Sequence, residues 1–148
     1  PDASNRDIAL YGVFGGALNS TDGRYTYFIY PENIEEPNLF EYTLMPMHST
    51  SMFEVRELKN AELFRGFNYT KGAPVLKIPA LMDAKRPPMQ GGGFAETRTW
   101  LYDLRNDLQQ NEPFRSQTAE KNLIDKIIKE MNLNNSPHEL FHRFRLQN

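Results

Sequence analysis

The chain has 148 residues, enough for one compact domain with a hydrophobic core and too few for two ordinary domains. Its 39% hydrophobic and 12% aromatic residues predict a folded protein, and its formal net charge of −2 favours neither nucleic acid nor an anionic membrane as a partner. Cysteine is absent, which excludes disulfides, a thiolate zinc site and a cysteine nucleophile within this chain. No apolar run is long enough to cross a bilayer.

The start of the chain bears on where the protein resides. It opens at Pro1 without a methionine, which is typical of a processed or excised piece of a longer protein, so a missing signal peptide says little. The compartment stays unknown, and we favour the bacterial cytoplasm or periplasm. Asn19-Ser20-Thr21 and Asn68-Tyr69-Thr70 fit the N-glycosylation pattern, which has meaning only in a secreted eukaryotic protein.

Two strands joined by a tight turn are predicted first. Residues 8–14 are apolar on both faces, which predicts a central strand, and Gly15-Gly16 then allows a turn or bulge. Asp22-Gly23 predicts a hairpin, because both residues tolerate positive φ. The second strand spans 24–30 and ends at Pro31. Alternation puts two sets of side chains on opposite faces of this strand: Tyr25, Tyr27 and Ile29 on one, Thr26, Phe28 and Tyr30 on the other.

An irregular stretch follows the second strand. Residues 31–38 form an acidic loop bounded by prolines, and 40–44 form a short strand. Residues 45–50 are expected to be irregular, because Pro46 cannot continue a ladder of backbone hydrogen bonds.

A helix and two short strands occupy the middle of the chain. Residues 51–54 have capping-box spacing, and a helix over 53–64 follows. Short strands are predicted at 67–70 and 75–79. Residues 83–93 contain two adjacent prolines and three consecutive glycines, and therefore predict a loop.

The last third of the chain predicts one strand and two helical segments. Residues 100–104 form the strand. Apolar residues then recur at helical spacing and make one face of an amphipathic helix: Ala119, Leu123, Ile124, Ile127, Ile128 and Met131. Asn134-Asn135 breaks this helix, and 136–139 form a second capping box with Pro137 at the first helical position.

Together these elements predict an α+β fold. We expect about four mostly antiparallel strands, a middle helix, and an amphipathic C-terminal helix packed on one face of the sheet. Residues 1–148 are expected to form a single domain.

His138-Glu139-Leu140-Phe141-His142 matches the HExxH pattern of zinc metalloproteases. Two histidines four residues apart can share a zinc ion, but a third ligand is needed and only six residues follow, none of a type that zinc prefers. Glu139 is already explained as a capping-box residue. We therefore interpret the match as fortuitous and expect no metal site at His138 and His142.

Several segments, taken in order, resemble the C-terminal region of the sulfatase family, in the alkaline-phosphatase-like superfamily. Residues 11–16 leading into Thr21-Asp22-Gly23-Arg24-Tyr25 resemble the family's late strand pair. Residues 40–46 and 70–77 resemble the segments that follow. Leu101-Tyr102-Asp103-Leu104 resembles the family's ending, after which a terminal helix packs back, although Leu108 replaces a usual proline. The resemblance covers about residues 7–145.

This resemblance implies that the chain is the C-terminal subdomain of a larger hydrolase of sulfuric esters. The family's chemistry uses a formylglycine made from Cys/Ser-x-Pro-x-Arg, Asp and Asn ligands for calcium, and lysines and histidines that neutralise the sulfate. This chain contains neither Cys/Ser-x-Pro-x-Arg nor Asp-His-Gly. The resemblance thus implies calcium and formylglycine for the whole protein and no cofactor in this chain, and we expect the chain alone to be inactive.

Within this chain we expect no catalytic residue, and three residues are candidates for contact with substrate. Arg24 lies at a predicted hairpin tip, His48 in an irregular segment flanked by hydroxyl side chains, and Lys71 in a turn between strands. Each also has an ordinary structural interpretation: turn chemistry, a hydrogen-bonded histidine, and an exposed turn lysine. The expected partners are an upstream catalytic domain and, for the whole protein, a sulfated small molecule or glycan. We also expect self-association through apolar surface left exposed between domains.

Two other functions remain open. A phosphonate or phosphodiester hydrolase of the same superfamily would carry the same C-terminal region. A non-catalytic carbohydrate-binding module would need exposed aromatic side chains near polar groups, and the single tryptophan, Trp100, is interpreted as a core residue.

Overall fold

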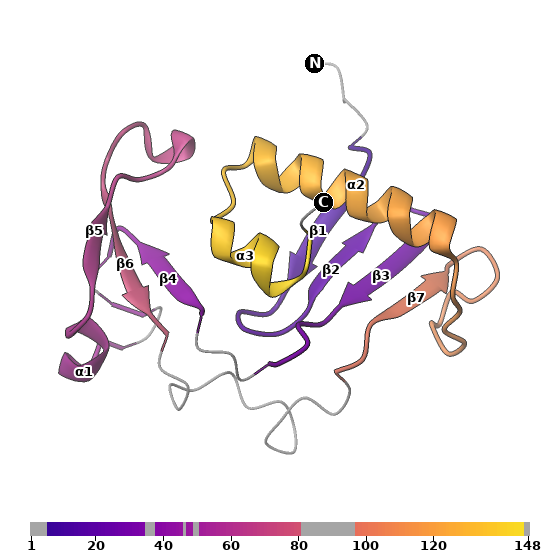
Figure 1. Ribbon diagram of the computed structural model, residues 1–148, viewed down its shortest axis with the longest axis horizontal. Helices are drawn as coiled ribbons and strands as arrows, with labels where there is room; N and C mark the ends of the chain where they lie inside the picture. The colour runs from indigo at the N-terminus through magenta and orange to yellow at the C-terminus, as the bar shows by residue number, and fades with distance from the viewer. Residues whose placement is uncertain (1–5, 35–37, 46, 49–50, 81–96, 147–148) are drawn as a thin grey trace. The chain divides into compact units, whose positions relative to one another are not determined.

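The computed structural model describes residues 6–34, 38–45, 47–48, 51–80 and 97–146 (Figure 1). The chain divides into two compact units. Unit 1 comprises residues 1–34 and 88–148, and unit 2 comprises residues 35–87. The sequence predicts one domain over 1–148 and does not indicate this division. The predicted loop at 83–93 lies outside the described residues.

Unit 1 is built on a four-stranded antiparallel sheet, which confirms the predicted α+β class. The strands lie in the order β1-β2-β3-β7. Their bounds are Ala9–Gly12 for β1, Leu18–Thr21 for β2, Tyr25–Ile29 for β3 and Trp100–Asp103 for β7. The Asp22-Gly23 turn joins β2 to β3, as its sequence predicts, and Gly23 has a φ of +87°.

The prediction of a central first strand is wrong, because β1 is an edge strand that pairs only with β2 within the described sheet. The chain turns after β1, where the Gly16 N–H donates to the Val13 carbonyl at 2.8 Å, and it returns as β2. The polar sequence of β2, Leu-Asn-Ser-Thr, gives little strand signal by itself. Tyr11 and Val13 are correspondingly exposed, at 46% and 44%.

The predicted C-terminal helix is α2, Gln117–Leu133, and it lies across one face of the sheet (Figure 1). Its start is capped by Ser116, whose hydroxyl accepts the Ala119 N–H at 3.3 Å. The core between helix and sheet contains residues from both layers: Tyr27, Ile29, Leu101, Leu123, Ile127 and Met131. The predicted alternation in β3 is also confirmed, since Phe28 lies on the opposite face, in edge-to-face contact with Tyr11 and Tyr102.

A short second helix, α3, spans His138–Arg143. It follows the predicted break, where Asn135 has a φ of +55°. The predicted position of Pro137 inside the helix is wrong by one residue, because Pro137 is the residue that precedes the first helical one. Phe141 is buried in the core of unit 1.

Unit 2 is built on a three-stranded antiparallel sheet in the order β4-β6-β5. Its elements are β4 (Phe40–Thr43), α1 (Val55–Leu58), β5 (Glu62–Phe64), the 3-10 turn η1 (Asn68–Thr70) and β6 (Val75–Pro79). The predicted strands at 40–44 and 75–79 are thus confirmed.

Two local predictions in unit 2 are wrong. The predicted helix over 53–64 is a single turn, α1, because Glu62–Phe64 pairs with β6 instead. Val55 is 88% exposed, so α1 gains little from packing. The predicted capping box at 51–54 lies three residues later, where the Glu54 N–H donates to Glu57 Oε2 at 2.6 Å.

The predicted strand at 67–70 is also wrong, because η1 occupies it. The Thr70 hydroxyl accepts the Phe67 N–H at 3.0 Å and so closes this turn. Among the described residues, no helix has the length and apolar character that a bilayer-spanning segment requires.

Candidate functional site

The Asp22 carboxylate fixes the hairpin tip that contains Arg24. Its Oδ1 atom accepts the N–H groups of Arg24 at 3.1 Å and Tyr25 at 2.9 Å. Its Oδ2 atom accepts a hydrogen bond from Lys126 Nζ, on α2, at 3.1 Å. The turn is therefore tied to the helix that covers the sheet.

Arg24 is engaged within unit 1. Its Nη2 atom lies 3.2 Å from Asp103 Oδ2, and its guanidinium lies over the Tyr25 ring at 4.6 Å. The Leu104 N–H donates to the Arg24 carbonyl at 2.7 Å. The structure thus brings the Thr21–Tyr25 segment and the Leu101–Leu104 segment together, and it gives Arg24 a structural role. Asp103 is the partner that the sequence pattern did not identify, since the register between β3 and β7 is needed to find it.

Acid should weaken this arrangement through Asp22. Burial raises the pKa of the Asp22 carboxyl, but the Tyr25 N–H and Lys126 outweigh it, and the folded-state pKa is lowered. Stability from this group is therefore present above the unfolded pKa of about 3.9 and is lost as pH falls through the lower folded pKa. In urea unfolding at pH 6 and pH 3, we expect Asp22→Asn to be less stable than the wild type at pH 6 and the difference to shrink at pH 3. A difference that stays constant with pH would contradict this.

His48 lies between two glutamates of unit 2. Its Nε2 atom is 2.9 Å from Glu57 Oε1, and its Nδ1 atom is 3.6 Å from Glu41 Oε2. Its ring packs on Phe53 with the centroids 4.2 Å apart. Neither glutamate was a sequence candidate; the only signal was the helical spacing of Glu54 and Glu57. Both ring nitrogens face carboxylates, which favours the structural interpretation of His48.

The two glutamates around His48 have pKa values shifted in opposite directions. Burial raises the pKa of Glu41, and His48 only partly offsets it. Burial also raises the pKa of Glu57, but the Glu54 N–H and His48 outweigh it and lower the pKa overall.

Removing the imidazole should change the titration of Glu57. We expect His48→Ala to raise the pKa of Glu57, because the mutation removes a hydrogen bond that favours the ionised carboxylate. Carboxyl ¹³C chemical shifts followed against pH measure this pKa. His138→Ala, an exposed histidine of unit 1, is the matched control and should leave Glu57 unchanged. An unchanged Glu57 titration in His48→Ala would contradict the assignment.

Lys71 lies in an exposed turn directly after η1. Its backbone is left-handed, with a φ of +52°, and its N–H donates to the Asn68 carbonyl at 3.1 Å. Arg24 therefore belongs to unit 1, whereas His48 and Lys71 belong to unit 2. Each of the three side chains has a different local environment.

The histidines of the HExxH match, His138 and His142, are both exposed on α3. Between and beside them, Phe141 and Arg143 are buried, and Arg143 Nη2 donates to the Gly15 carbonyl at 3.1 Å. Within the part of the chain that the structure describes, no three His, Cys, Asp or Glu residues are grouped so that they could hold a metal ion.

Unit 1 also contains a cavity of about 340 Å³ that no sequence signal indicated. It lies between the end of β3, the 97–99 segment, α2 and the end of α3. Its described lining is Tyr27, Ile29, Tyr30, Pro31, Glu32, Thr97, Thr99, Ile124, Arg143, Phe144, Arg145 and Leu146. Glu32 and Arg145 form an ion pair there. The described lining combines hydroxyl side chains, the carboxylate of Glu32 and the guanidinium groups of Arg143 and Arg145.

Comparison with known proteins gives no match: no protein-family model, curated protein or solved structure matches this chain.

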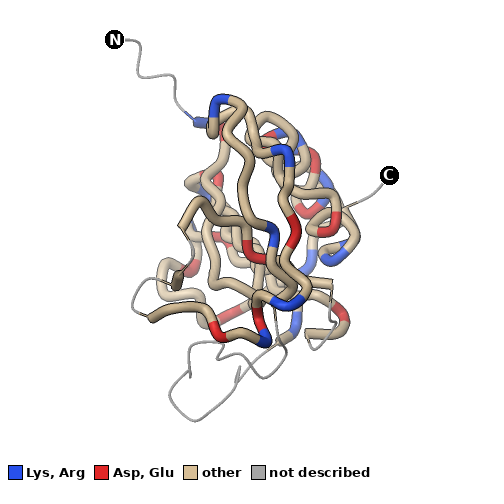
Figure 2. The backbone as a smooth tube through the Cα atoms, turned by 90° about the vertical axis from the view of Figure 1, so that its left-hand side faces the viewer, with Lys and Arg blue, Asp and Glu red and all other residues tan. Residues whose placement is uncertain are grey.

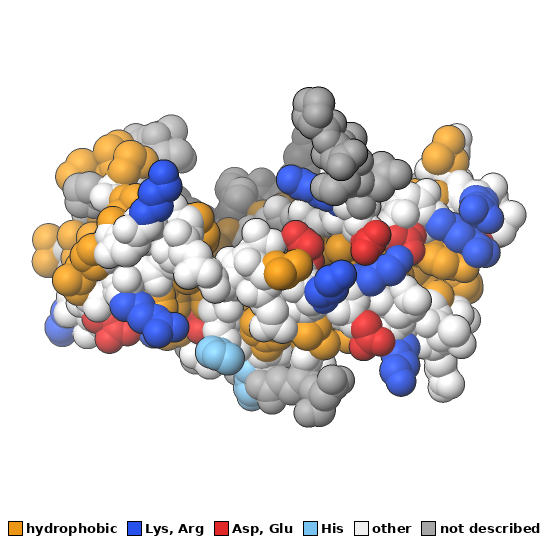
Figure 3. Space-filling view, turned by 90° about the horizontal axis from the view of Figure 1, so that it is seen from above, with side chains coloured by type: hydrophobic (Ala, Val, Ile, Leu, Met, Phe, Trp, Pro, Cys, Tyr) orange, Lys and Arg blue, Asp and Glu red, His pale blue; other side chains and the backbone are white. Residues whose placement is uncertain are grey.

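Large apolar side chains are exposed in both units. Figure 2 shows acidic and basic residues interspersed along the described backbone, with no extended run of one sign. Figure 3 shows hydrophobic side chains gathered over part of the molecule. In unit 2 the most exposed apolar side chains are Leu44, Met45, Met52, Val55, Leu63 and Tyr69, each at least 55% exposed.

Proposed function

We propose that this chain is the C-terminal subdomain of a sulfatase, a sulfuric ester hydrolase of the alkaline-phosphatase-like superfamily. The observation that carries this proposal is the meeting of the two most specific sequence segments. The Thr21–Tyr25 turn and the Leu101–Leu104 strand lie side by side, joined by the Arg24–Asp103 ion pair. The helix expected after the second segment, α2, covers the same sheet and reaches the turn through Lys126.

In this proposal the chain supports the catalytic domain and does not perform chemistry. Arg24 and His48, two of the three candidates for contact with a sulfate, are both engaged by carboxylates of their own units. The exposed apolar side chains of both units provide surface for the upstream domain, among them Tyr11 in unit 1 and Leu63 in unit 2. The nucleophile and the calcium ligands belong to that domain.

A phosphonate or phosphodiester hydrolase of the same superfamily is the second candidate, because its catalytic domain would be supported by the same kind of C-terminal subdomain. The two are separated by substrate. The product of the complete reading frame should be assayed with 4-methylumbelliferyl sulfate, with the matching phosphodiester, and with a phenyl phosphonate ester. We expect sulfate turnover by that product and none by residues 1–148 alone. Preference for a phosphorus ester would transfer the proposal to the second candidate, and enzyme-like turnover by residues 1–148 would overturn it.

A further inference from the structure

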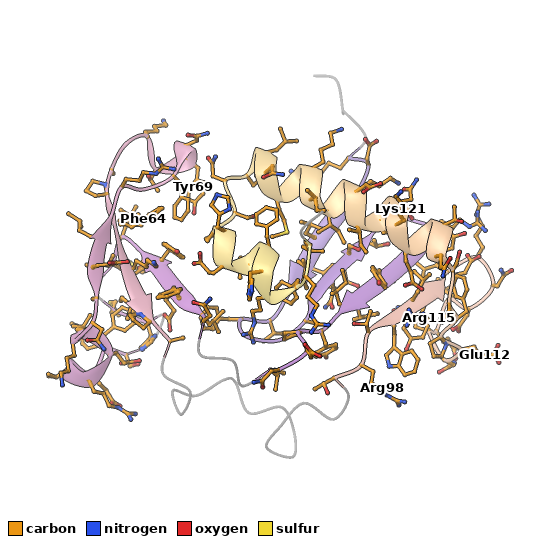
Figure 4. All side chains as sticks on the ribbon, viewed as in Figure 1. Phe64, Tyr69, Arg98, Glu112, Arg115 and Lys121 are labelled. Atoms are coloured by element: carbon orange, nitrogen blue, oxygen red, sulfur yellow. The ribbon has the colours of Figure 1, made fainter. Side chains whose placement is uncertain are left out.

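Four aromatic rings of unit 2 form a contiguous cluster, here called the aromatic platform. They are Tyr42, Phe64, Phe67 and Tyr69. Phe64 and Phe67 are 5.2 Å apart, and Tyr69 stacks on Phe67 at 5.1 Å with the ring planes only 7° from parallel. Tyr69 is 69% exposed, so its ring is held by Phe67 and remains open to solvent. Figure 4 labels Phe64 on β5 and Tyr69 on the turn that follows it.

The turn that carries Tyr69 is fixed by hydrogen bonds. The Thr70 hydroxyl accepts the Phe67 N–H and lies 2.8 Å from the Phe67 carbonyl and 2.9 Å from the Ala73 carbonyl, to one of which it donates. The Lys71 N–H and the Ala73 N–H also donate within the turn. A platform that is ordered before binding loses less conformational entropy when it takes a ligand.

The segment around the platform is more basic than the whole chain. Residues 62–77 contain Arg65, Lys71 and Lys77 against one acid, Glu62, a net charge of +2, whereas the whole chain has −2. Lys77 pairs with Glu62 at 3.0 Å and also lies over the Phe40 ring, which shares a sheet face with Tyr42. Arg65 and Lys71 are exposed.

This combination favours a sugar over a protein surface as the ligand. The core of a protein–protein interface is depleted of charged residues, whereas here the Lys77–Glu62 pair lies on the same face as the rings. The faces of a sugar ring carry C–H groups that pack on an electron-rich aromatic face, and its hydroxyls need polar partners at the edge. The excess positive charge adds preference for an anionic substituent.

We propose that the aromatic platform is a binding subsite for a sulfated carbohydrate. Tyr69 stacks on a sugar ring, and the exposed cations of the same segment, Lys71 foremost, attract the sulfate group. The choice of sulfate as the anion rests on the function proposed above. The choice of a carbohydrate is inferred from the aromatic platform. The platform has the exposed aromatic ring near polar groups that a carbohydrate-binding module would need.

Binding to residues 1–148 can be measured by calorimetry with sulfated hexasaccharides from κ-carrageenan, chondroitin sulfate and fucoidan, each beside its desulfated form. We expect at least one sulfated probe to bind. Tyr69→Ala should weaken that binding by about tenfold, as loss of one aromatic stacking contact predicts. Tyr11→Ala, an exposed tyrosine of unit 1, should change it by less than about twofold. Lys71→Gln should weaken binding of the sulfated form and leave the desulfated form unchanged.

Any one of three results would contradict the proposed subsite. The first two are that no probe binds and that Tyr69→Ala binds as tightly as the wild type. The third is that an oligouridylate, a single-stranded RNA, competes with the bound sulfated sugar as well as the sugar itself does. Backbone amide NMR spectra of each variant show whether the fold is retained. Tyr69→Phe keeps the aromatic ring and should therefore bind the sulfated probe like the wild type. The two proposals fail separately. If a glycan binds but the reading frame encodes no sulfatase motif, the sulfatase proposal fails and the chain is a carbohydrate-binding module. If the protein is a sulfatase but its C-terminal region binds none of the probes, only the subsite proposal fails.

Discussion

Ile127→Ala is expected to lower the free energy of unfolding of unit 1 by about 2–5 kcal/mol, the usual range for deleting a large aliphatic side chain from a core. Ile127 is 0% exposed and belongs to the α2 face that packs on Tyr27, Ile29 and Leu101. The neighbouring layers can close only partly over the missing methyl and methylene groups, so a cavity remains. Urea unfolding followed by the fluorescence of Trp100, the single tryptophan and a residue of β7, reports on this unit.

Leu133→Ala is the matched control for this experiment. Leu133 ends the same helix but is 67% exposed, so its loss should change the unfolding free energy by less than about 0.5 kcal/mol. Equal losses at the two positions would mean that α2 does not cover the sheet as described.

Gly66→Ala is expected to disrupt the turn that carries the aromatic platform. A Cβ atom at this position would lie 2.2 Å from the Ala73 carbonyl oxygen and 2.6 Å from Thr70 Oγ1, and the Gly66 φ of +86° disfavours any side chain. The backbone must move to relieve the clash, which would open the hydrogen bonds of Thr70. Amide hydrogen exchange across β5 and β6 should accelerate, because these strands are joined by this turn.

Gly72→Ala separates the clash from the backbone conformation. Gly72 has a similar φ of +83°, but nothing lies within 4 Å of its Cβ position. Its substitution should therefore cost only the left-handed conformation, about 1–2 kcal/mol, and less than Gly66→Ala. If the two variants exchange alike in β5 and β6, the close packing of the turn at Gly66 is wrong.

The sequence predicts α2 well because its signal is local and long. Seventeen residues with apolar side chains at helical spacing, preceded by the Ser116 cap, leave little room for another structure. The Asp22-Gly23 hairpin is predicted for a similar reason, since two adjacent residues determine the turn type.

Pairing between distant segments explains the errors. Residues 53–64 contain good helix formers, yet Glu62–Phe64 pairs with β6. Helix propensity differs by only a few tenths of a kcal/mol per residue, which is less than the strand pairing contributes. β2 is a strand because β1 and β3 flank it, not because of its own composition. The partner of Arg24 was missed for the same reason, because Asp103 lies 79 positions away in the sequence. Glu41, on β4, approaches His48 across the irregular segment that separates them.

The sulfatase proposal is tested most directly at the gene that encodes this chain, by reading the codons upstream of Pro1. We predict that the same frame continues there and encodes a Cys/Ser-x-Pro-x-Arg segment, with the Asp residues of a calcium site around it. Mass spectrometry of the purified product should then detect formylglycine at the first residue of that segment. A frame that opens at this chain, or one that continues upstream without such a segment, would contradict the proposal.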